Sequence, residues 1–236
     1  MSSIIENNWI RNADEKSSDL VSYLNWFDGI KDKREYIQTG HIDFFNRILT
    51  MDMYKFLGNP YDKKSLEIGF GGGRLVNAAM KVFSHCYGID ILNEECIKKT
   101  KSIVSQLNDI DNCTLINREY KSSIETKSID FIYSFIVFQH FHDINEIYNY
   151  INFSKRVLKD DGCGIFYFGR NDRNNEDYVC FKELVNQRGC SLYLNKNFAK
   201  SIMETKFDII EIGEVTKKPW DNRRSGQFYI KFKNKN

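Results

Sequence analysis

Short apolar runs alternate with longer amphipathic segments after Pro60, and this alternation constrains the fold more than any other feature of the chain. Five apolar runs of strand length lie at 65–70, 85–90, 114–117, 129–135 and 164–168. Segments with apolar residues at helical spacing separate most of these runs, at 73–83, 93–107 and 144–158. This repetition predicts a parallel sheet with helices on both faces, and right-handed crossovers make it doubly wound.

The two ends of the chain follow other patterns. Before Pro60, apolar residues recur at helical spacing, which predicts a helical cap over residues 1–60. Near the other end we expect helices at 177–188 and 195–205, then two strands at 207–215 and 227–232. The connection between these strands carries no helical pattern, so we expect an antiparallel pair at the sheet edge. The predicted fold class is α/β, with a doubly wound, seven-stranded, mostly parallel sheet, an antiparallel last strand and an N-terminal helical cap on a domain of residues 61–236.

The balance of charges limits the partners that we expect. The 236 residues include 34 Lys and Arg against 32 Asp and Glu, which leaves a formal net charge of +2. A protein that neutralises a phosphate backbone needs a concentrated basic surface, so we expect no nucleic-acid partner. A small anionic substrate remains compatible with this composition, because two or three local cations can hold it.

Cysteines and hydropathy predict neither a metal site nor a membrane segment. The six cysteines are scattered without a C-x-x-C pair, so we expect reduced thiols and no zinc site or disulfide framework. Residues 1–12 are polar and resemble no signal peptide. The longest apolar run, 129–141, is too short to span a bilayer, so a cytoplasmic protein without a membrane partner is expected.

The segment LEIGFGGGRL, residues 66–75, carries the sharpest chemical signal. It lies where the first strand ends and a helix begins, and glycines there allow a tight turn and close approach of a ligand. Glu67 lies within the strand, where a carboxylate needs a compensating partner, and Asp90 ends the next strand, where it can accept ribose hydroxyls. The simpler alternative is that the glycines only form a loop.

The glycine spacing excludes two common nucleotide sites. A dinucleotide fingerprint would need its third glycine at the position of Arg74 or Val76, and no G-K-S or G-K-T of a P-loop occurs. The pattern Glu67-x-Gly69-x-Gly71-x-Gly73 instead resembles the first motif of class I S-adenosylmethionine-dependent methyltransferases, and Asp90 resembles their ribose-binding acid. An acidic site also suits an ammonium and a sulfonium better than a pyrophosphate. The resemblance implies cofactor contacts at Glu67, Gly69, Phe70, Gly71, Gly73, Asp90 and Ile91.

The resemblance extends over about residues 65–232. SIDFIYSFIVFQHF resembles the fourth strand of that family, with Phe135 at its carboxyl end, and FDIIEI and FYIKFK resemble the antiparallel sixth and seventh strands. Glu119 is the nearest match to the acidic loop that flanks adenine. Upstream, REYIQTGHIDFF resembles the lead-in of a bacterial subgroup of small-molecule methyltransferases, which implies that Tyr36, Thr39 and Gly40 close over the cofactor. The alternative is a helical cap that merely packs on the sheet.

The acceptor would lie beyond the fourth and fifth strands. His140 is the candidate general base, because a hydroxyl acceptor must lose a proton and imidazole has a suitable pKa; a histidine here could instead pack or bind backbone. Arg170 and Arg173 follow the fifth strand and could bind phosphate or carboxylate, although exposed basic loops are common. We therefore expect O-methylation of a small, anionic or carbohydrate-linked acceptor, a metabolite or surface polysaccharide, with S-adenosylhomocysteine as the second product.

Two other classes of function stay open. A nicotinamide-dependent oxidoreductase or sugar epimerase would share the sheet and Asp90, but it needs a glycine where Arg74 stands. A non-catalytic binding module would keep the cofactor pocket and lack an acceptor site. The sequence decides neither between oxygen and nitrogen acceptors nor which oligomeric state the protein adopts.

Overall fold

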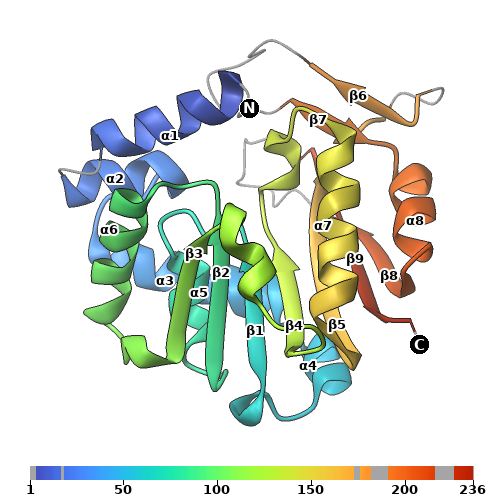
Figure 1. Cartoon of the computed structure of the whole chain (residues 1–236), viewed down its shortest axis with the longest axis horizontal. Coiled ribbons are helices and arrows are strands. Elements are labelled where there is room, and N and C mark those ends of the chain that lie inside the picture. Colours follow the sequence, from blue (N-terminus) through green and yellow to red (C-terminus); the bar gives the residue numbers. More distant parts are fainter. Residues whose placement is uncertain (1–3, 17–18, 173–175, 182–190, 216–225, 236) are drawn as a thin grey trace.

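A seven-stranded sheet forms the centre of the molecule in the computed structural model, which describes residues 4–16, 19–172, 176–181, 191–215 and 226–235. The strands lie in the order β3-β2-β1-β4-β5-β9-β8 (Figure 1). Their bounds are β1 Lys64–Ile68, β2 His85–Asp90, β3 Cys113–Asn117, β4 Ile129–Ser134, β5 Leu158–Gly169, β8 Phe207–Glu214 and β9 Gln227–Asn234. All seven predicted strands are present, so the predicted sheet is confirmed.

The directions of the strands place a crevice at the carboxyl ends of the central strands. β1 pairs in parallel with both β2 and β4, and β4 pairs in parallel with β5. β9 lies antiparallel between β5 and β8, which confirms the antiparallel last strand and leaves β8 as the edge strand. The chain moves outward from β1 in both directions, and ligands of such sheets bind beyond the carboxyl ends at this switch point.

Helices cover both faces of the sheet (Figure 1). Their apolar side chains divide into two buried clusters, one shared by the first six helices and the other by the last two. The first group is α1 Ile4–Lys16, α2 Leu20–Asp28, α3 Lys33–Asp43, α4 Met51–Leu57, α5 Arg74–Ala79 and α6 Glu94–Ser105. The second group is α7 Ile144–Val157 and α8 Lys196–Glu204. Because the sheet is buried on both faces, its inner strands are almost continuously apolar.

Acidic and amide side chains begin several of these helices. Asp19 accepts from the Ser22 N–H before α2, and Asp32 accepts from the Glu35 N–H before α3, each at 2.8 Å. Asp143 accepts from the Asn145 N–H at 2.9 Å, so it caps α7. Each such cap contributes about 1 kcal/mol to helix stability.

Residues 178–180 are a strand and correct the expectation of a helix over 177–188. Tyr178–Cys180 forms strand β6, which pairs antiparallel with β7, Leu192–Leu194, while residues 182–190 lie outside the described residues. The aromatic and β-branched residues of this segment suit a strand, and a partner far along the chain satisfies its backbone. Short-range periodicity therefore gave the wrong element here.

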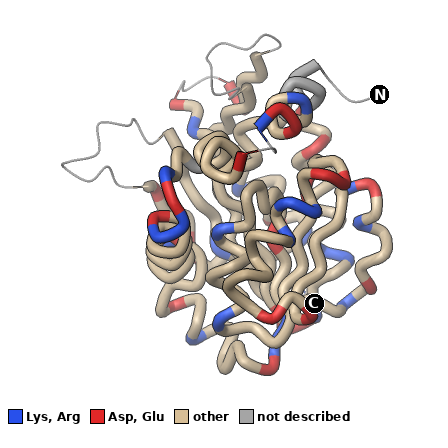
Figure 2. The backbone as a smooth tube through the Cα atoms, turned by 90° about the vertical axis from the view of Figure 1, so that its left-hand side faces the viewer, with Lys and Arg blue, Asp and Glu red and all other residues tan. Residues whose placement is uncertain are grey.

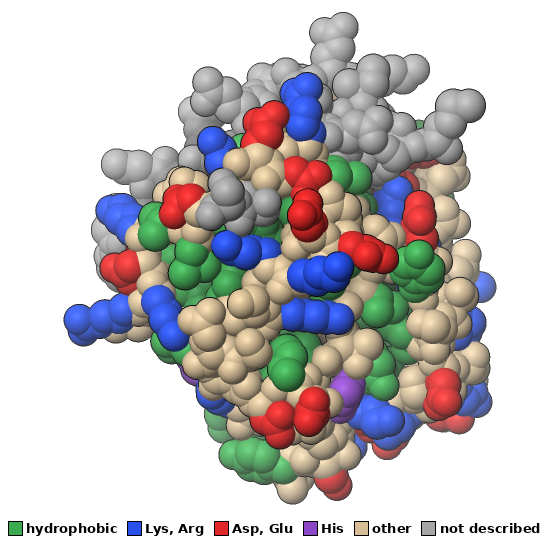
Figure 3. All heavy atoms as spheres, turned by 60° about the vertical axis from the view of Figure 1, so that its left-hand side comes forward, with side chains coloured by type: hydrophobic (Ala, Val, Ile, Leu, Met, Phe, Trp, Pro, Cys, Tyr) green, Lys and Arg blue, Asp and Glu red, His purple; other side chains and the backbone are tan. Residues whose placement is uncertain are grey.

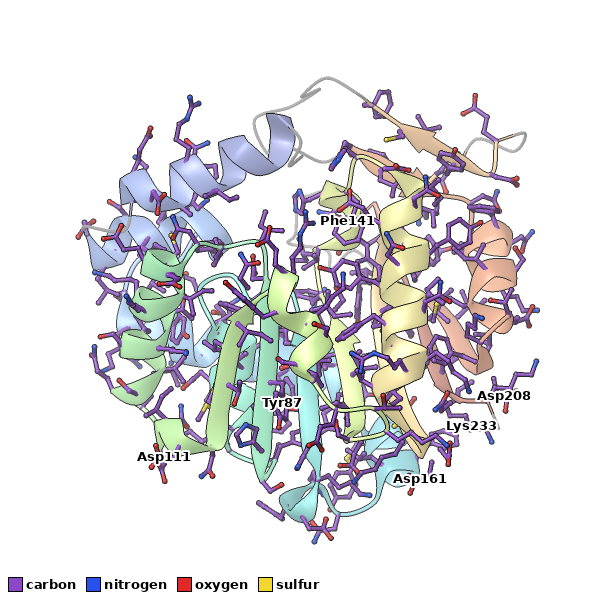
Figure 4. All side chains as sticks on the ribbon, viewed as in Figure 1. Tyr87, Asp111, Phe141, Asp161, Asp208 and Lys233 are labelled. Carbon is purple, nitrogen blue, oxygen red and sulfur yellow. The ribbon has the colours of Figure 1, made fainter. Side chains whose placement is uncertain are left out.

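The switch-point end of the sheet is the upper end in Figures 1 and 4. Phe141, after β4, lies at this end, whereas Asp111, before β3, and Asp161, in the first half of β5, lie at the opposite end (Figure 4). Helices α1 and α2 lie at the upper left and β6 at the upper right (Figure 1). The carboxyl ends of β1, β2 and β4 lie between helices α1 and α2 on one side and strand β6 on the other (Figure 1).

Helix hydropathy and surface charge can be compared with the expectations from the sequence in the described part of the chain. None of its helices is both long and apolar enough to cross a bilayer. Basic and acidic residues are interspersed along the backbone in Figure 2 and over the face shown in Figure 3. This mixed pattern is what the nearly balanced composition predicts.

Candidate cofactor and acceptor site

The glycine-rich segment forms a tight turn after β1. The Gly69 N–H donates to the Ile89 carbonyl at 2.7 Å, and the Gly73 N–H donates to the Phe70 carbonyl at 2.7 Å. Gly69 has φ of 78°, a left-handed conformation, and a Cβ there would fall 2.2 Å from Cγ2 of Val137. Only glycine satisfies both conditions, so the turn keeps bare backbone against its neighbours.

Side chains from two helices donate to carbonyl groups of this turn, and a side chain from a third helix contacts one of these donors. The Tyr36 hydroxyl of α3 donates to the Gly72 carbonyl at 3.0 Å, and Oγ1 of Thr100 in α6 donates to the Gly71 carbonyl at 3.1 Å. The Tyr23 hydroxyl of α2 lies 2.8 Å from Oγ1 of Thr100. The N-terminal helices thereby fix the conformation of a loop far along the chain.

Asp90 connects the end of β2 to the glycine turn. Its Oδ2 accepts from the Gly71 N–H at 2.8 Å, and its Oδ1 accepts from the N–H groups of Ile91 at 2.7 Å and Leu92 at 3.3 Å. Burial raises the pKa of the carboxyl group to about 6, although these hydrogen bonds and the charge of Arg118 act in the opposite direction. Asp90 is therefore mostly ionised at neutral pH.

Glu67 places a second carboxylate beside the turn. The residue is only 2% exposed, and its Oε2 accepts a hydrogen bond of 3.1 Å from the Tyr133 hydroxyl on β4. Burial, with the neighbouring Glu67 charge as the next cause, raises the pKa of Tyr133 well above its usual value. The neutral phenol supplies a donor that a buried carboxylate requires.

These groups line one pocket beyond the carboxyl ends of β1, β2 and β4. Its walls enclose about 1030 Å³ of empty space, part of it open to solvent, which is ample for a ligand of nucleoside size. The residues predicted from the sequence that line it are Glu67, Gly69, Phe70, Gly71, Asp90, Ile91, Phe135 and His140. Gly73 lies just behind the wall and caps the N-terminus of α5.

The predicted contacts from α3 lie behind the pocket wall. Tyr36 is fully buried, and its hydroxyl donates to the Gly72 carbonyl of the turn. Oγ1 of Thr39 donates to the Glu35 carbonyl of its own helix at 2.7 Å. Gly40 lets two helices approach closely, because a Cβ there would fall 2.5 Å from the Arg74 carbonyl oxygen. In this structure the segment supports the turn and does not line the pocket.

The loop after β3 turns a different residue toward the pocket than predicted. Glu119 is exposed and does not line the pocket; the Asn117 side chain accepts from its backbone N–H at 2.8 Å. Arg118 lines the pocket instead. The 3-10 turn η4, Arg118–Ser123, begins here, and its tight rotation directs neighbouring side chains apart.

The predicted anion site after β5 is only partly described. Arg170 does not line the pocket, and its guanidinium pairs with Asp172 at 3.0 Å and with Glu214 at 2.8 Å. Arg173 lies outside the described residues. The arginines that line the pocket are Arg74 and Arg118.

A polar cluster at the Asp90 end of the pocket was missed by the sequence analysis. Glu146 of α7 pairs with Nη1 of Arg118 at 3.3 Å and with Nδ1 of His142 at 3.1 Å. Arg118 also hydrogen-bonds Tyr150, whose pKa is raised mainly by burial. The i, i+4 spacing of His142 and Glu146, on either side of the capping Asp143, was the available signal.

Ile136 marks the other border of the pocket. It follows β4 with φ of 61°, although a β-branched side chain strongly disfavours this region. Such a conformation costs about 1–3 kcal/mol and is typical of binding sites.

Among the described residues, no His, Cys, Asp and Glu side chains gather in a group that could hold a metal ion.

Comparison with known families and structures agrees with this pocket. Residues 66–166 match a family model described as a methyltransferase domain. The match spans the glycine turn, Asp90 and the segment directly after β4, which line the pocket. None of the curated proteins compared with the chain matches it.

Solved structures with the same fold cover most of the chain. The N-methyltransferase NodS of Bradyrhizobium japonicum, in complex with S-adenosylhomocysteine, has a TM-score of 0.62 at 12% identity, over 96% of this chain and 98% of that chain. A protein from Pyrococcus horikoshii has a TM-score of 0.61 at 16% identity, over 90% and 96%. A methyltransferase from Methanosarcina mazei has a TM-score of 0.61 at 17% identity, over 78% and 97%.

The pocket also passes a chemical test for the cofactor of these enzymes. Bare backbone at Gly69 and Gly71 admits a ligand that side chains would exclude, since a Cβ at Gly71 would lie 2.9 Å from the Phe27 ring. Two carboxylates suit a ligand that carries positive charge and hydroxyl donors. Residues 66–166 thus match a methyltransferase domain, the chain shares the fold of solved methyltransferases, and the pocket fits S-adenosylmethionine as a cofactor.

Proposed function

We propose that the protein transfers the methyl group of S-adenosylmethionine to an oxygen of a small, carbohydrate-linked or anionic acceptor. The observation that carries this proposal is the position of His140, which lines the same pocket as the glycine turn and Glu67. A hydroxyl acceptor must lose its proton during transfer, and imidazole is the side chain best suited to accept it at neutral pH.

The cofactor would lie with its ribose at Asp90 and its amino group at Glu67. Asp90 keeps acceptor capacity for a hydroxyl donor, because a carboxylate offers about four lone-pair directions and this one accepts from three backbone N–H groups. Glu67 would balance an ammonium group. Adenine would then lie toward Arg118 and Tyr150, since both act electrostatically near Asp90. The bound cofactor supplies an electrophilic methyl group on a sulfonium.

The acceptor would enter beside the segment that follows β4. The short helix η5, Phe138–His140, is closed by a hydrogen bond of 2.8 Å from the His140 N–H to the Val137 carbonyl. Val137 in turn packs against Gly69, so the turn that carries His140 is fixed relative to the glycine loop. The role of the chain in this reaction is to align the acceptor, exclude water and accept one proton.

Acceptor panels test this proposal directly. The protein would be incubated with S-adenosylmethionine and either hydroxylated sugars and sugar nucleotides or small amines, and methylated products would be identified by mass spectrometry. The proposal predicts methyl ethers from the hydroxyl panel and no methylated amine. Methylation confined to amines would contradict it, and NADH binding without S-adenosylhomocysteine binding would favour an oxidoreductase.

A further inference from the structure

A hairpin from a later part of the chain holds the segment between β4 and α7. This segment, residues 137–142, supplies four residues to the wall of the pocket, namely Val137, His140, Phe141 and His142. The hairpin consists of β6 and β7, which pair antiparallel. The match to the methyltransferase family model ends at residue 166, so the hairpin lies outside the matched part of the chain.

Ser191, directly before β7, donates to the carbonyl groups on both sides of His140. Its backbone N–H donates to the Gln139 carbonyl at 2.8 Å. Its Oγ donates to the Phe141 carbonyl at 2.6 Å and lies 3.5 Å from the carbonyl oxygen of His140 itself. Ser191 is only 1% exposed, so solvent has little access to these hydrogen bonds. One buried residue thereby fixes the backbone before and after the histidine.

Contacts from two other elements act on the same segment. Sγ of Cys180 in β6 donates to the His142 carbonyl at 2.9 Å. Nε2 of Gln227, the first residue of β9, donates to Oε1 of Gln139 at 2.7 Å. The hairpin is anchored in turn, because Leu192 of β7 is fully buried in the cluster under α7 and α8. The segment is therefore held between the hairpin and the sheet.

These contacts matter because a helix end leaves its last carbonyl groups without partners inside the helix, and η5 ends at His140. A general base must also lie within hydrogen-bond reach of the proton that it accepts, and a displacement of about 1 Å can cost about 10²-fold in rate. We propose that Ser191 is a positioning residue, which fixes the point where the His140 imidazole meets the acceptor hydroxyl. This inference rests on the proposed function, in which His140 accepts the proton.

The alternative is that Ser191 only joins the hairpin to the rest of the fold. Its hydroxyl would then affect turnover equally whether or not residue 140 is a histidine. A positioning residue acts through the histidine, so its effect disappears once the histidine is replaced. A double-mutant cycle separates the two roles, since it measures the dependence of one substitution on the other.

The cycle consists of Ser191→Ala, His140→Gln and the double variant, with kcat measured on the hydroxyl acceptor that the acceptor panel identifies. Ser191→Ala removes the hydrogen bond to the Phe141 carbonyl and keeps the backbone bond to Gln139. We expect it to lower kcat by about 10–100-fold and to leave the affinity for S-adenosylhomocysteine unchanged. In the His140→Gln background the same substitution should change kcat by less than about twofold. Equal losses in both backgrounds, or no loss in either, overturn the proposal.

NMR spectra of the histidine rings test the position of His140 without any acceptor. The chain has four histidines, and the ring resonance that disappears in His140→Gln belongs to His140. With S-adenosylhomocysteine added, Ser191→Ala should shift this resonance and leave those of His41 and His85 unchanged. A His140 resonance that does not move overturns the proposal.

Ser154→Ala is the matched control, because Oγ of Ser154 donates to the Tyr150 carbonyl at 2.7 Å and the residue is equally buried. It should leave kcat and all four histidine resonances unchanged, and a loss of kcat equal to that of Ser191→Ala would contradict the proposal. If Ser191→Ala fails to fold, Ser191→Cys undergoes the same comparisons, since it replaces the hydroxyl by a weak donor. If no hydroxyl acceptor is methylated, the proposed function fails, whereas the histidine spectra still decide whether Ser191 fixes His140.

Discussion

At the scale of single residues, Asp90 links cofactor binding to pH. Burial raises its pKa to about 6, and only the ionised carboxylate offers the ribose hydroxyls a group that purely accepts hydrogen bonds. Affinity for S-adenosylhomocysteine should therefore be highest above pH 7 and decrease as the pH drops through 6. Well below the pKa, the decrease in affinity should approach about tenfold per pH unit. Calorimetry between pH 5 and 8 measures this.

Asp90→Asn supplies the control for that prediction. It should bind more weakly at pH 7 and lack the dependence near pH 6, because the amide does not titrate there. A wild-type affinity that stays constant from pH 5 to 8 would show that Asp90 is not the group that controls binding.

The same side chain decides between an enzyme and a non-catalytic module. Asp90→Ala should abolish the biological output of an enzyme through loss of cofactor affinity and leave that of a module that acts without cofactor unchanged.

Gly69 tests the shape of the turn. Gly69→Ala places a Cβ at a left-handed φ and against Val137, so we expect the free energy of unfolding to fall by about 2–4 kcal/mol and cofactor affinity to be lost. Gly29→Ala is the matched control, because Gly29 is left-handed with φ of 69° and has nothing within 4 Å of the added Cβ. That variant should lose only about 1–2 kcal/mol. Equal losses in chemical denaturation would refute the contact with Val137.

His140 tests the proposed proton acceptor. His140→Gln should lower kcat by about 10²–10⁴-fold and leave the affinity for S-adenosylhomocysteine unchanged, since a general base acts on the acceptor. His41→Gln is a suitable control: the Nδ1 atom of His41 lies 2.7 Å from the Ile37 carbonyl of its own helix, and His41 does not line the pocket. Unchanged turnover in His140→Gln would exclude the histidine as the base.

The sequence predicted those site residues whose position follows from backbone geometry. Glu67, the glycines and Asp90 lie at strand ends, and the sheet topology alone brings neighbouring strand ends together. Thr39 and Glu119 could not be placed in this way, because the direction of a side chain on a helix or a 3-10 turn depends on tertiary packing. In the sequence, Arg74 served only to exclude a dinucleotide fingerprint, because it occupies the position of the third glycine.

At the scale of elements, helix α3 supports the glycine turn through one hydroxyl group. Tyr36→Phe should lower the free energy of unfolding by about 1 kcal/mol and weaken cofactor binding, because it removes the hydrogen bond to the Gly72 carbonyl. Tyr54→Phe, at an exposed position of α4, should change neither quantity. Denaturant titration and calorimetry of both variants provide the comparison, and an unaffected Tyr36→Phe would deny α3 this role.

Elements with strong periodicity or flanking signals were predicted within a few residues, whereas those set by distant partners were not. Strand β2 has the predicted bounds, and α7 begins where Asp143 caps it. Strand β6 has only three residues and depends on β7, which lies about a dozen positions later in the chain. Helix α5 ends at Ala79, earlier than expected, since a tight turn with the Lys81 N–H bonded to the Ala78 carbonyl follows it.

At the scale of the whole molecule, the N-terminal helices and the sheet share one buried cluster. Tyr36, Phe44 and Met53 of the first helices are fully buried together with Tyr133 of β4 and Tyr167 of β5. The division into a cap of residues 1–60 and a methyltransferase domain of residues 61–236 stays a prediction, as does the cytoplasmic location.

The central claim is that the pocket beyond the carboxyl ends of β1, β2 and β4 holds a sulfonium nucleoside. A crystal structure of the complex with S-adenosylhomocysteine tests it most directly. We predict electron density with the ribose hydroxyls on Asp90, the amino group beside Glu67 and the backbone of Gly69 against the ligand. A ligand bound elsewhere on the protein, or a dinucleotide whose pyrophosphate lies on the glycine turn, would contradict the claim.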